Sequence, residues 1–228
     1  MLSSWGIGFE GVDLERTPER WEDLRRLGIP SYPATILGNR FVHGWNPTDL
    51  AALVGVEYDA GRRFEPEELA QRLDRILAAN QRAVRQIPRE RLGMKHPQRD
   101  RSVRDLAFHI FRLALAFRDC REQDQFPEGW LREVPGPDLP DGEAIAGYGQ
   151  SVRGRLQDWY AQPGWCEGDV HTYYGSHPAR ELMERTTWHA AQHLRQVYWF
   201  LDEMGIPAEG RLTDADLAGL PFPKEVWS

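Results

Sequence analysis

The chain has 228 residues and a mass of 26.3 kDa, enough for one large domain or two small ones with a sizeable core. Acidic residues outnumber Lys plus Arg by 35 to 28, and this net charge of −7 argues against nucleic acid as the main partner. No apolar run reaches the roughly 18 residues of a membrane span, and residues 1–6 lack the pattern of a signal peptide. Two cysteines, Cys120 and Cys166, exclude a disulfide framework, so we expect a cytoplasmic protein that does not bind membranes.

Residues 1–57 predict a small α/β unit with the element order β-α-β-β-α. Its predicted elements, in chain order, are a strand at 7–14, a helix at 17–28, strands at 32–37 and 40–43, and a helix at 46–55. Thr17-Pro18 is typical of a helix start, and Gly38-Asn39 is typical of a hairpin turn. A polar linker at residues 56–64 is expected to follow this unit.

Residues 64–206 predict a different architecture, because four long segments each carry an apolar stripe at helical spacing. The predicted helices cover residues 67–87, 102–123, 142–160 and 178–204. Their lengths favour a four-helix bundle, with a small hairpin around Tyr173-Tyr174-Gly175 before the last helix. The tail at residues 207–228 is expected to pack on the surface. The fold class is therefore mainly α.

Histidines interrupt the apolar stripe of the last predicted helix. His189 and His193 stand at i and i+4, so their imidazoles project from one face within reach of one ion, and His109 flanks the stripe of the second helix. Three neutral imidazoles would leave coordination positions for water or substrate, as in catalytic metal sites. Imidazole ligation suits several divalent metals; we favour Zn, with Ni, Fe, Mn or Cu as alternatives.

A plainer interpretation is that these are ordinary core or surface histidines. Burying unpaired polar side chains costs a few kcal/mol each, and this cost argues for a shared partner. Two further candidates have a functional interpretation: Tyr173 (substrate positioning) and Asn80 (supporting the site). The others have a functional and a structural interpretation: Arg185 (substrate carboxylate or solvated face), Gln196 (metal-bound water, His193 or a plain contact), Asp105 (orienting His109 or capping the helix), and His171 and His177 (pocket mouth or solvent).

Two stretches resemble a known family. Ser102–His109 (SVRDLAFH) resembles the second helix of the DinB/YfiT-like metalloenzymes, and Thr186–Gln196 (TTWHAAQHLRQ) resembles their H-x-x-x-H-x-x-Q fourth helix. The resemblance covers roughly residues 64–206. It implies an up-down-down-up bundle, a divalent metal on His109, His189 and His193, and frequent homodimers. Characterised relatives in the family include thiol S-transferases and a maleylpyruvate isomerase that use mycothiol or bacillithiol.

The N-terminal part resembles the second half of a glutaredoxin. Ser31-Tyr-Pro33-Ala-Thr-Ile is similar to the segment around the glutaredoxin cis-proline, and Gly44–Leu50 (GWNPTDL) is similar to the helix start that follows. The usual Cys-x-x-Cys is missing, because no cysteine precedes Cys120. Thiol–disulfide exchange needs a thiolate, so this part is not expected to perform it. Either the domain is degenerate, or the true start of the chain lies upstream.

Together these features predict a divalent-metal-dependent enzyme that activates a low-molecular-weight thiol or water, and so is thiol S-transferase-like or hydrolase-like toward a small-molecule substrate. Two alternatives stay open: a non-catalytic metal or small-ligand binding module, and an interaction protein that uses the glutaredoxin-like part as a docking or dimer surface. Cys120 and Cys166 as a redox pair is a further idea, although lone thiols are commonly inert core residues.

Overall fold

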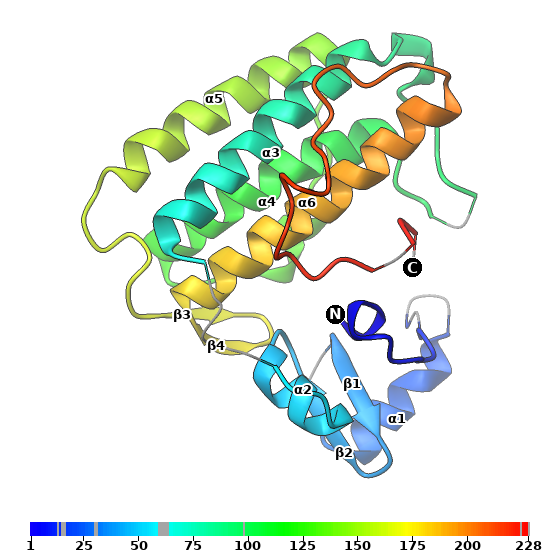
Figure 1. The fold of residues 1–228 in the computed structure, drawn as a ribbon, viewed down its shortest axis with the longest axis vertical. Coiled ribbons are helices and arrows are strands. Elements are labelled where there is room, and N and C mark those ends of the chain that lie inside the picture. The colour runs from blue at the N-terminus through cyan, green and yellow to red at the C-terminus, as the bar shows by residue number, and fades with distance from the viewer. Residues whose placement is uncertain are drawn as a thin grey trace.

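The computed structural model is mainly helical and describes residues 1–12, 14, 17–29, 32–58, 64–97, 99–223 and 225–227. Its four long helices are α3 (Pro66–Gln86), α4 (Val103–Gln123), α5 (Gly142–Tyr160) and α6 (Ala179–Glu203). They lie side by side as a bundle (Figure 1), and each boundary falls within one residue of its predicted position. None of the described helices combines the length and the apolar character that crossing a membrane requires.

The helices α3 and α6 run in one direction, and α4 and α5 run in the other. At the shared start of α3 and α6, Arg180 donates to the carbonyl of Phe64 at 2.7 Å. The antiparallel pairing of α3 and α5 is fixed by two contacts: Arg153 forms an ion pair with Asp74 at 2.7 Å, and Gln81 Nε2 donates to the carbonyl of Ala146 at 2.9 Å. This is an up-down-down-up order, in which α3 and α4 each pack mainly against α5 and α6.

Capping side chains define where the helices begin, and small residues let neighbouring helices pack closely. The Ser102 side chain accepts from the backbone N–H of Asp105 at the start of α4, and Asp141 caps α5 in the same way through Ala144. Gly149 lies against the ring of Phe111, where an added Cβ would stand 2.3 Å from Cζ. The bundle core is a continuous cluster of buried apolar side chains, among them Leu69, Leu73, Phe111, Phe117, Ile145, Leu182 and Phe200.

A small hairpin precedes α6, as predicted. Its strands are β3 (Asp169–Thr172) and β4 (Gly175–Pro178), paired antiparallel with Val170 opposite His177. Thr172 Oγ1 closes the turn by donating to the carbonyl of Gly175 at 2.7 Å. The turn therefore presents Tyr173 and Tyr174 beside the first turns of α6, where both contact Arg185.

The N-terminal unit contains the predicted hairpin and both predicted helices. Its elements are a 3₁₀ turn (Pro18–Arg20) leading into α1 (Trp21–Arg26), β1 (Ala34–Leu37), β2 (Arg40–His43) and α2 (Pro47–Val54). Asn46 caps α2 by accepting from Asp49, and Gly55 ends it at φ +75°. The Tyr32–Pro33 peptide is cis. Ser31 and most of the expected linker lie outside the described residues, and the glutaredoxin resemblance stays a prediction.

The strand predicted at residues 7–14 is wrong for the residues described there. Residues 7–12 and Leu14 form no strand, and a 3₁₀ turn at Leu2–Trp5 precedes them. Glycines at 6, 8 and 11 weaken extended structure, because they lose more backbone entropy on ordering than other residues. The sheet that does form has two strands, β1 and β2, so residues 7–12 gain no ladder of hydrogen bonds from it.

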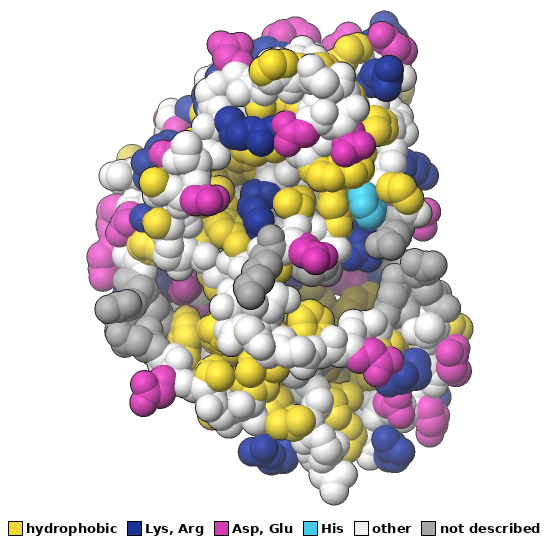
Figure 2. All heavy atoms as spheres, turned by 45° about the vertical axis from the view of Figure 1, so that its right-hand side comes forward, with side chains coloured by type: hydrophobic (Ala, Val, Ile, Leu, Met, Phe, Trp, Pro, Cys, Tyr) yellow, Lys and Arg dark blue, Asp and Glu magenta, His cyan; other side chains and the backbone are white. Residues whose placement is uncertain are grey.

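The N-terminal unit meets the bundle at the β3–β4 hairpin, at α6 and at the segment that follows α4. Gly44 lies against Tyr174 with φ +72°, where an added Cβ would stand 2.6 Å from the ring. The rings of Trp45 and Trp188 are 5.1 Å apart, and Tyr32 donates to Glu128 at 2.6 Å. Figure 2 shows that the surface is hollowed between the two parts, with side chains of both charges around it.

The C-terminal tail runs back along the bundle (Figure 1). Leu217 and Leu220 are buried, and Trp188 Nε1 donates to the carbonyl of Pro221 at 2.9 Å. Near the end of the chain, Trp227 stacks on His96 with ring centroids 4.3 Å apart. The tail thereby covers part of α6 next to its histidines.

Candidate metal centre

His109, His189 and His193 lie together between α4 and α6. One ligand nitrogen from each ring lies within 4.8 Å of the others. The ring centroids are 5.7 Å apart for His109 and His189, 5.1 Å for His109 and His193, and 4.6 Å for His189 and His193. The antiparallel course of α4 and α6 brings the second turn of α4 opposite the middle of α6. One divalent ion could therefore contact all three rings.

Each histidine is placed by the face on which it stands. His109 is 2% exposed, because every residue of α4 from Leu106 to Phe117 is buried. His189 and His193 are separated by one helical turn and are partly exposed. The group is therefore buried on the α4 side and partly exposed on the α6 side, although Nε2 of His193 is itself buried.

The tautomer of His193 is defined by its neighbours. Its Nδ1 lies 2.6 Å from Oε1 of Gln196, and Nε2 of the same amide donates to the carbonyl of Val226 at 3.2 Å. Because the Val226 carbonyl requires a donor, the amide oxygen faces the ring, and Nδ1–H must donate to it. Nε2 of a neutral His193 therefore carries the lone pair, which is the form that binds a metal.

Two imidazole nitrogens in this group are buried without a partner among the described residues: Nδ1 of His109 and Nε2 of His193. Leaving a buried polar atom unpaired costs about 1–3 kcal/mol. Zn and similar ions accept neutral imidazole nitrogens at about 2.0–2.1 Å. The donor set, its spacing and its unpaired atoms therefore fit a divalent metal ion.

The electrostatic surroundings keep these rings neutral. Burial, followed by the neighbouring charge of His193, lowers the pKa of both His109 and His189 well below the ordinary value. Burial also lowers the pKa of His193 to about 4, although the Gln196 hydrogen bond opposes this shift. Neutral imidazole is the ligand form, so the site does not have to release protons to bind a metal near pH 7.

Asp105 and Asn80 have structural partners instead of contacts with the histidines. Asp105 accepts from Ser102 Oγ at 2.7 Å, which completes the helix cap. Asn80 Nδ2 donates to the carbonyl of Ala107 at 2.8 Å and so links α3 to α4. Of the polar candidates in the sequence, Gln196 touches a histidine, and Arg185 precedes His189 by one turn of α6.

The remaining histidines lie outside the group. His171 is exposed and contacts Asp124 at 3.0 Å. His177 packs on Tyr174 with ring centroids 4.9 Å apart, and its charge adds to burial in lowering the pKa of His43 across the junction with the N-terminal unit. His96 lies under Trp227. At these positions they would not be further ligands of an ion held between α4 and α6.

Sequence reasoning missed one charge that acts on the group, that of Arg101. Its positive charge contributes to lowering the pKa of all three histidines. It precedes the N-cap of α4, and a cation there opposes the helix dipole. This unfavourable placement could have been noticed in the sequence, because a cation before a helix start indicates a role other than stabilising the helix.

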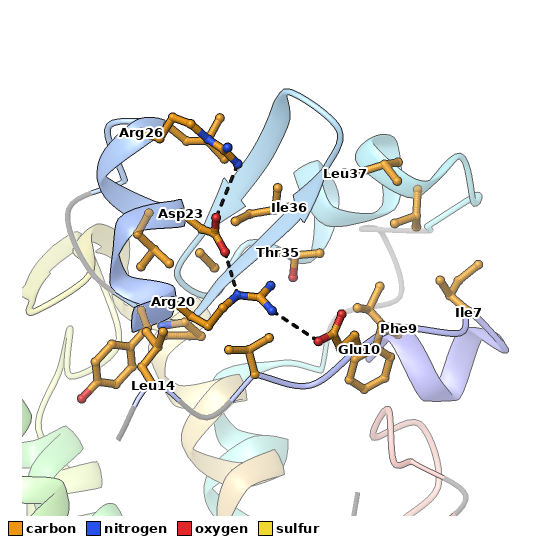
Figure 3. Close-up of a pocket in the computed structure, with 18 of the residues that line it drawn as sticks. Ile7, Phe9, Glu10, Leu14, Arg20, Asp23, Arg26, Thr35, Ile36 and Leu37 are labelled. Atoms are coloured by element: carbon orange, nitrogen blue, oxygen red, sulfur yellow. Dashed lines mark hydrogen bonds and ion pairs between the residues drawn. The ribbon is translucent and has the colours of Figure 1, made fainter. Parts of the chain in front are cut away.

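A hollow of about 740 Å³, separate from the histidine group, lies in the N-terminal unit (Figure 3). Apolar side chains such as Phe9 and Ile36 line it, and its wall carries Arg20, which pairs with Asp23 at 2.7 Å and with Glu10 at 3.5 Å. Its charged side chains thus neutralise one another, and neither cysteine nor any histidine lines it. The imidazole group is therefore the better candidate for chemistry.

No protein-family model matches the chain, and no curated protein matches it in sequence. Among solved structures, the chain is similar to YfiT from Bacillus subtilis, described as a probable metal-dependent hydrolase with an unusual four-helix bundle topology. The likeness has a TM-score of 0.47 and 16% sequence identity, and it covers 67% of this chain and 96% of YfiT. At this identity, residue roles do not transfer between the two chains.

Proposed function

We propose that this protein is a divalent-metal-dependent enzyme acting on a small molecule. His109, His189 and His193 would hold the ion, with Zn favoured. The observation that carries the proposal is the pair of buried, unpartnered nitrogens, Nδ1 of His109 and Nε2 of His193, within one close group of three neutral imidazoles. An ion would remove the cost of burying these atoms.

The ligand set also favours catalysis over a closed structural site. Three protein ligands leave at least one position of a four-coordinate ion for another molecule, and the group contains no fourth His, Cys, Asp or Glu among the described residues. When bound, such an ion lowers the pKa of a coordinated water or thiol toward neutrality and so supplies a nucleophile.

The chain's own side chains would orient the metal-binding rings and exclude water from one side of the site. Gln196 keeps the proton of His193 on Nδ1, which leaves Nε2 free and fixes the plane of the ring. The buried α4 face excludes water from behind His109. Burial raises the pKa of Tyr173, and it raises the pKa of Tyr174 to about 12, so both phenols stay protonated near pH 7 and can donate hydrogen bonds.

The ion would activate a low-molecular-weight thiol or water. The enzyme would then be S-transferase-like in the first case and hydrolase-like in the second. The chain's own thiols do not compete for this role, because burial raises the pKa of both Cys120 and Cys166 to about 11. We further propose that the protein is cytoplasmic and that it forms a homodimer. Sedimentation analysis of the purified chain would test the homodimer.

The test combines metal stoichiometry with turnover. Elemental analysis should find about one divalent ion per chain, and cobalt substitution should give the visible spectrum of a site open to an exogenous ligand. The variants H109A, H189A and H193A should lose the ion. The control variant H171A should keep it, because His171 is exposed and contacts Asp124.

Turnover is then measured with a low-molecular-weight thiol plus an electrophile, and separately with ester and amide substrates. Loss of turnover in the three ligand variants, with retention in H171A, would support the enzyme. Full turnover in the triple variant would refute it. A metal site with no open position and no turnover would instead favour a non-catalytic binding module.

A further inference from the structure

Arg185 and Arg112 are both buried arginines, but they differ in their partners. Arg112 is 6% exposed and pairs with Glu133 at 2.6 Å and with Asp119 at 3.2 Å. Arg185 is 8% exposed, and no carboxylate of the described residues lies within 4.0 Å of it. A buried charge without a counter-charge is costly, so Arg185 needs a reason to be there.

The contacts of Arg185 leave most of its donors unused. Nη2 donates to the Tyr173 hydroxyl at a long 3.4 Å, and the guanidinium carbon lies 4.9 Å from the centre of the Tyr174 ring. An arginine has five N–H donors in a planar fork. The hairpin tyrosines therefore hold the guanidinium against one aromatic face, and its remaining N–H groups have no acceptor in the described part of the chain.

Arg185 stands next to the metal centre along the helix. It precedes His189 by one turn on the same side of α6, so the two side chains are neighbours on that face. Arg101, whose charge also acts on these rings, donates to the carbonyl of Leu131 at 3.0 Å and forms no ion pair with any described residue. Asp105, its closest acidic influence, is engaged with Ser102.

Among the described residues, neither Arg185 nor Arg101 forms an ion pair, and no carboxylate joins the three imidazoles. We infer that the substrate carries a carboxylate, which Arg185 binds, while Arg101 adds attraction at longer range. This inference rests on the proposed function for the reacting group, but the anion subsite itself is independent of the metal. A planar carboxylate matches the two-pronged edge of a guanidinium whose face already rests on Tyr174.

The experiment is calorimetric titration with succinate, with its uncharged analogue succinamide, and with inorganic phosphate. Each probe is titrated into the zinc-loaded and the metal-free chain. The wild-type chain should bind succinate in both forms and succinamide in neither. Arg185→Gln should weaken succinate binding by about ten- to a hundredfold, as expected for a lost charge-assisted contact. Arg101→Gln should weaken it less, and its effect should shrink with added salt.

The matched control is Arg118→Gln, because Arg118 stands on α4 in an ion pair with Glu122 and should leave succinate binding unchanged. If Arg185→Gln does not fold, Arg185→Lys carries the test: it keeps the charge, loses the fork and should bind succinate several-fold more weakly than the wild type.

Equal succinate affinity in the Arg185 variants and the wild type would overturn the inference, as would the absence of succinate binding in both forms. Tighter binding of phosphate than of succinate would overturn the carboxylate assignment. Failure of zinc to bind, with succinate binding intact in the metal-free chain, would refute the metal function and leave the anion subsite standing.

Discussion

Gln196 joins His193 to the far end of the chain. Its Oε1 accepts from Nδ1 of His193 at 2.6 Å, while its Nε2 donates to the carbonyl of Val226 at 3.2 Å. The Gln196 amide therefore links a candidate metal ligand on α6 to the C-terminal tail, at a residue 30 positions after Gln196. The orientation of the ring depends on this link, because no other described hydrogen bond reaches Nδ1.

Replacing Gln196 by Leu should weaken metal binding without unfolding the bundle. The substitution keeps the side-chain size but frees the His193 ring, and losing such a supporting partner commonly lowers metal affinity by about 10–100-fold. Zinc affinity is measured by competition with a chromophoric chelator.

The matched control for Gln196 is Gln192→Leu. The Gln192 side chain also donates to the Val226 carbonyl, at 2.8 Å, but forms no hydrogen bond with any of the three histidines. Equal losses of zinc affinity in the two variants would show that tail anchoring matters and that ring orientation does not.

Gly44→Ala should loosen the N-terminal unit from the bundle. The new Cβ would stand 2.6 Å from the Tyr174 ring and 3.2 Å from its carbonyl oxygen, so the β3–β4 hairpin or the loop must move. We expect about 1–3 kcal/mol of destabilisation from this overpacking, in addition to the strain of φ +72°. Denaturant unfolding measures the stability, and limited proteolysis reports release of the unit.

Gly38→Ala separates these two effects. Gly38 has φ +62° but nothing within 4 Å of an added Cβ, so this variant carries the backbone strain of about 1 kcal/mol alone. If both variants lose the same stability, the contact between Gly44 and Tyr174 does not hold the two parts together.

Two glycines of α5 should respond to alanine with opposite signs. Gly149→Ala places a Cβ 2.3 Å from Phe111 and should destabilise the bundle by about 1–3 kcal/mol. Gly154→Ala meets nothing within 4 Å and should stabilise it by about 0.5–1 kcal/mol, because alanine loses less backbone entropy in a helix. Thermal unfolding compares the two; destabilisation of similar size in both would contradict the close packing of α5 on α4.

The two cysteines should react slowly in the folded protein. Burial raises the pKa of Cys120 and of Cys166 to about 11, so near pH 8 about one thiol in a thousand is ionised. Since the thiolate is the reacting form, alkylation by iodoacetamide should be about a hundredfold slower than for a free thiol. It should speed up about tenfold per pH unit up to the pKa.

Denaturant provides the control, because unfolding should return both thiols to ordinary reactivity. Folded-state stability should also fall as the pH rises above about 9, since the unfolded chain then loses thiol protons that the folded chain retains. Rapid alkylation of either cysteine at pH 8, or a disulfide between them under mild oxidation, would revive their role as a redox pair.

The sequence by itself determined the secondary structure of the bundle and the face on which each candidate histidine stands. Both follow from local rules: Ser102 and Asp141 cap their helices through neighbouring residues, and the spacing of His189 and His193 places them on one face. The same rules failed at residues 7–12, because a strand needs a partner and period-two alternation does not provide one.

Tertiary structure decided which polar side chains meet. His109 joins His189 and His193 because α4 and α6 run antiparallel, and Asp105 turns to its own helix cap. The charge of Arg101 acts on the site from a helix start, and the Val226 carbonyl accepts from Gln196 from the tail, at sequence distances that no periodicity encodes. In the described part of the chain Arg185 has no counter-ion, and this too depends on every element packed around it. Hydrogen bonds and charges act through space, so they become visible once the chain is folded.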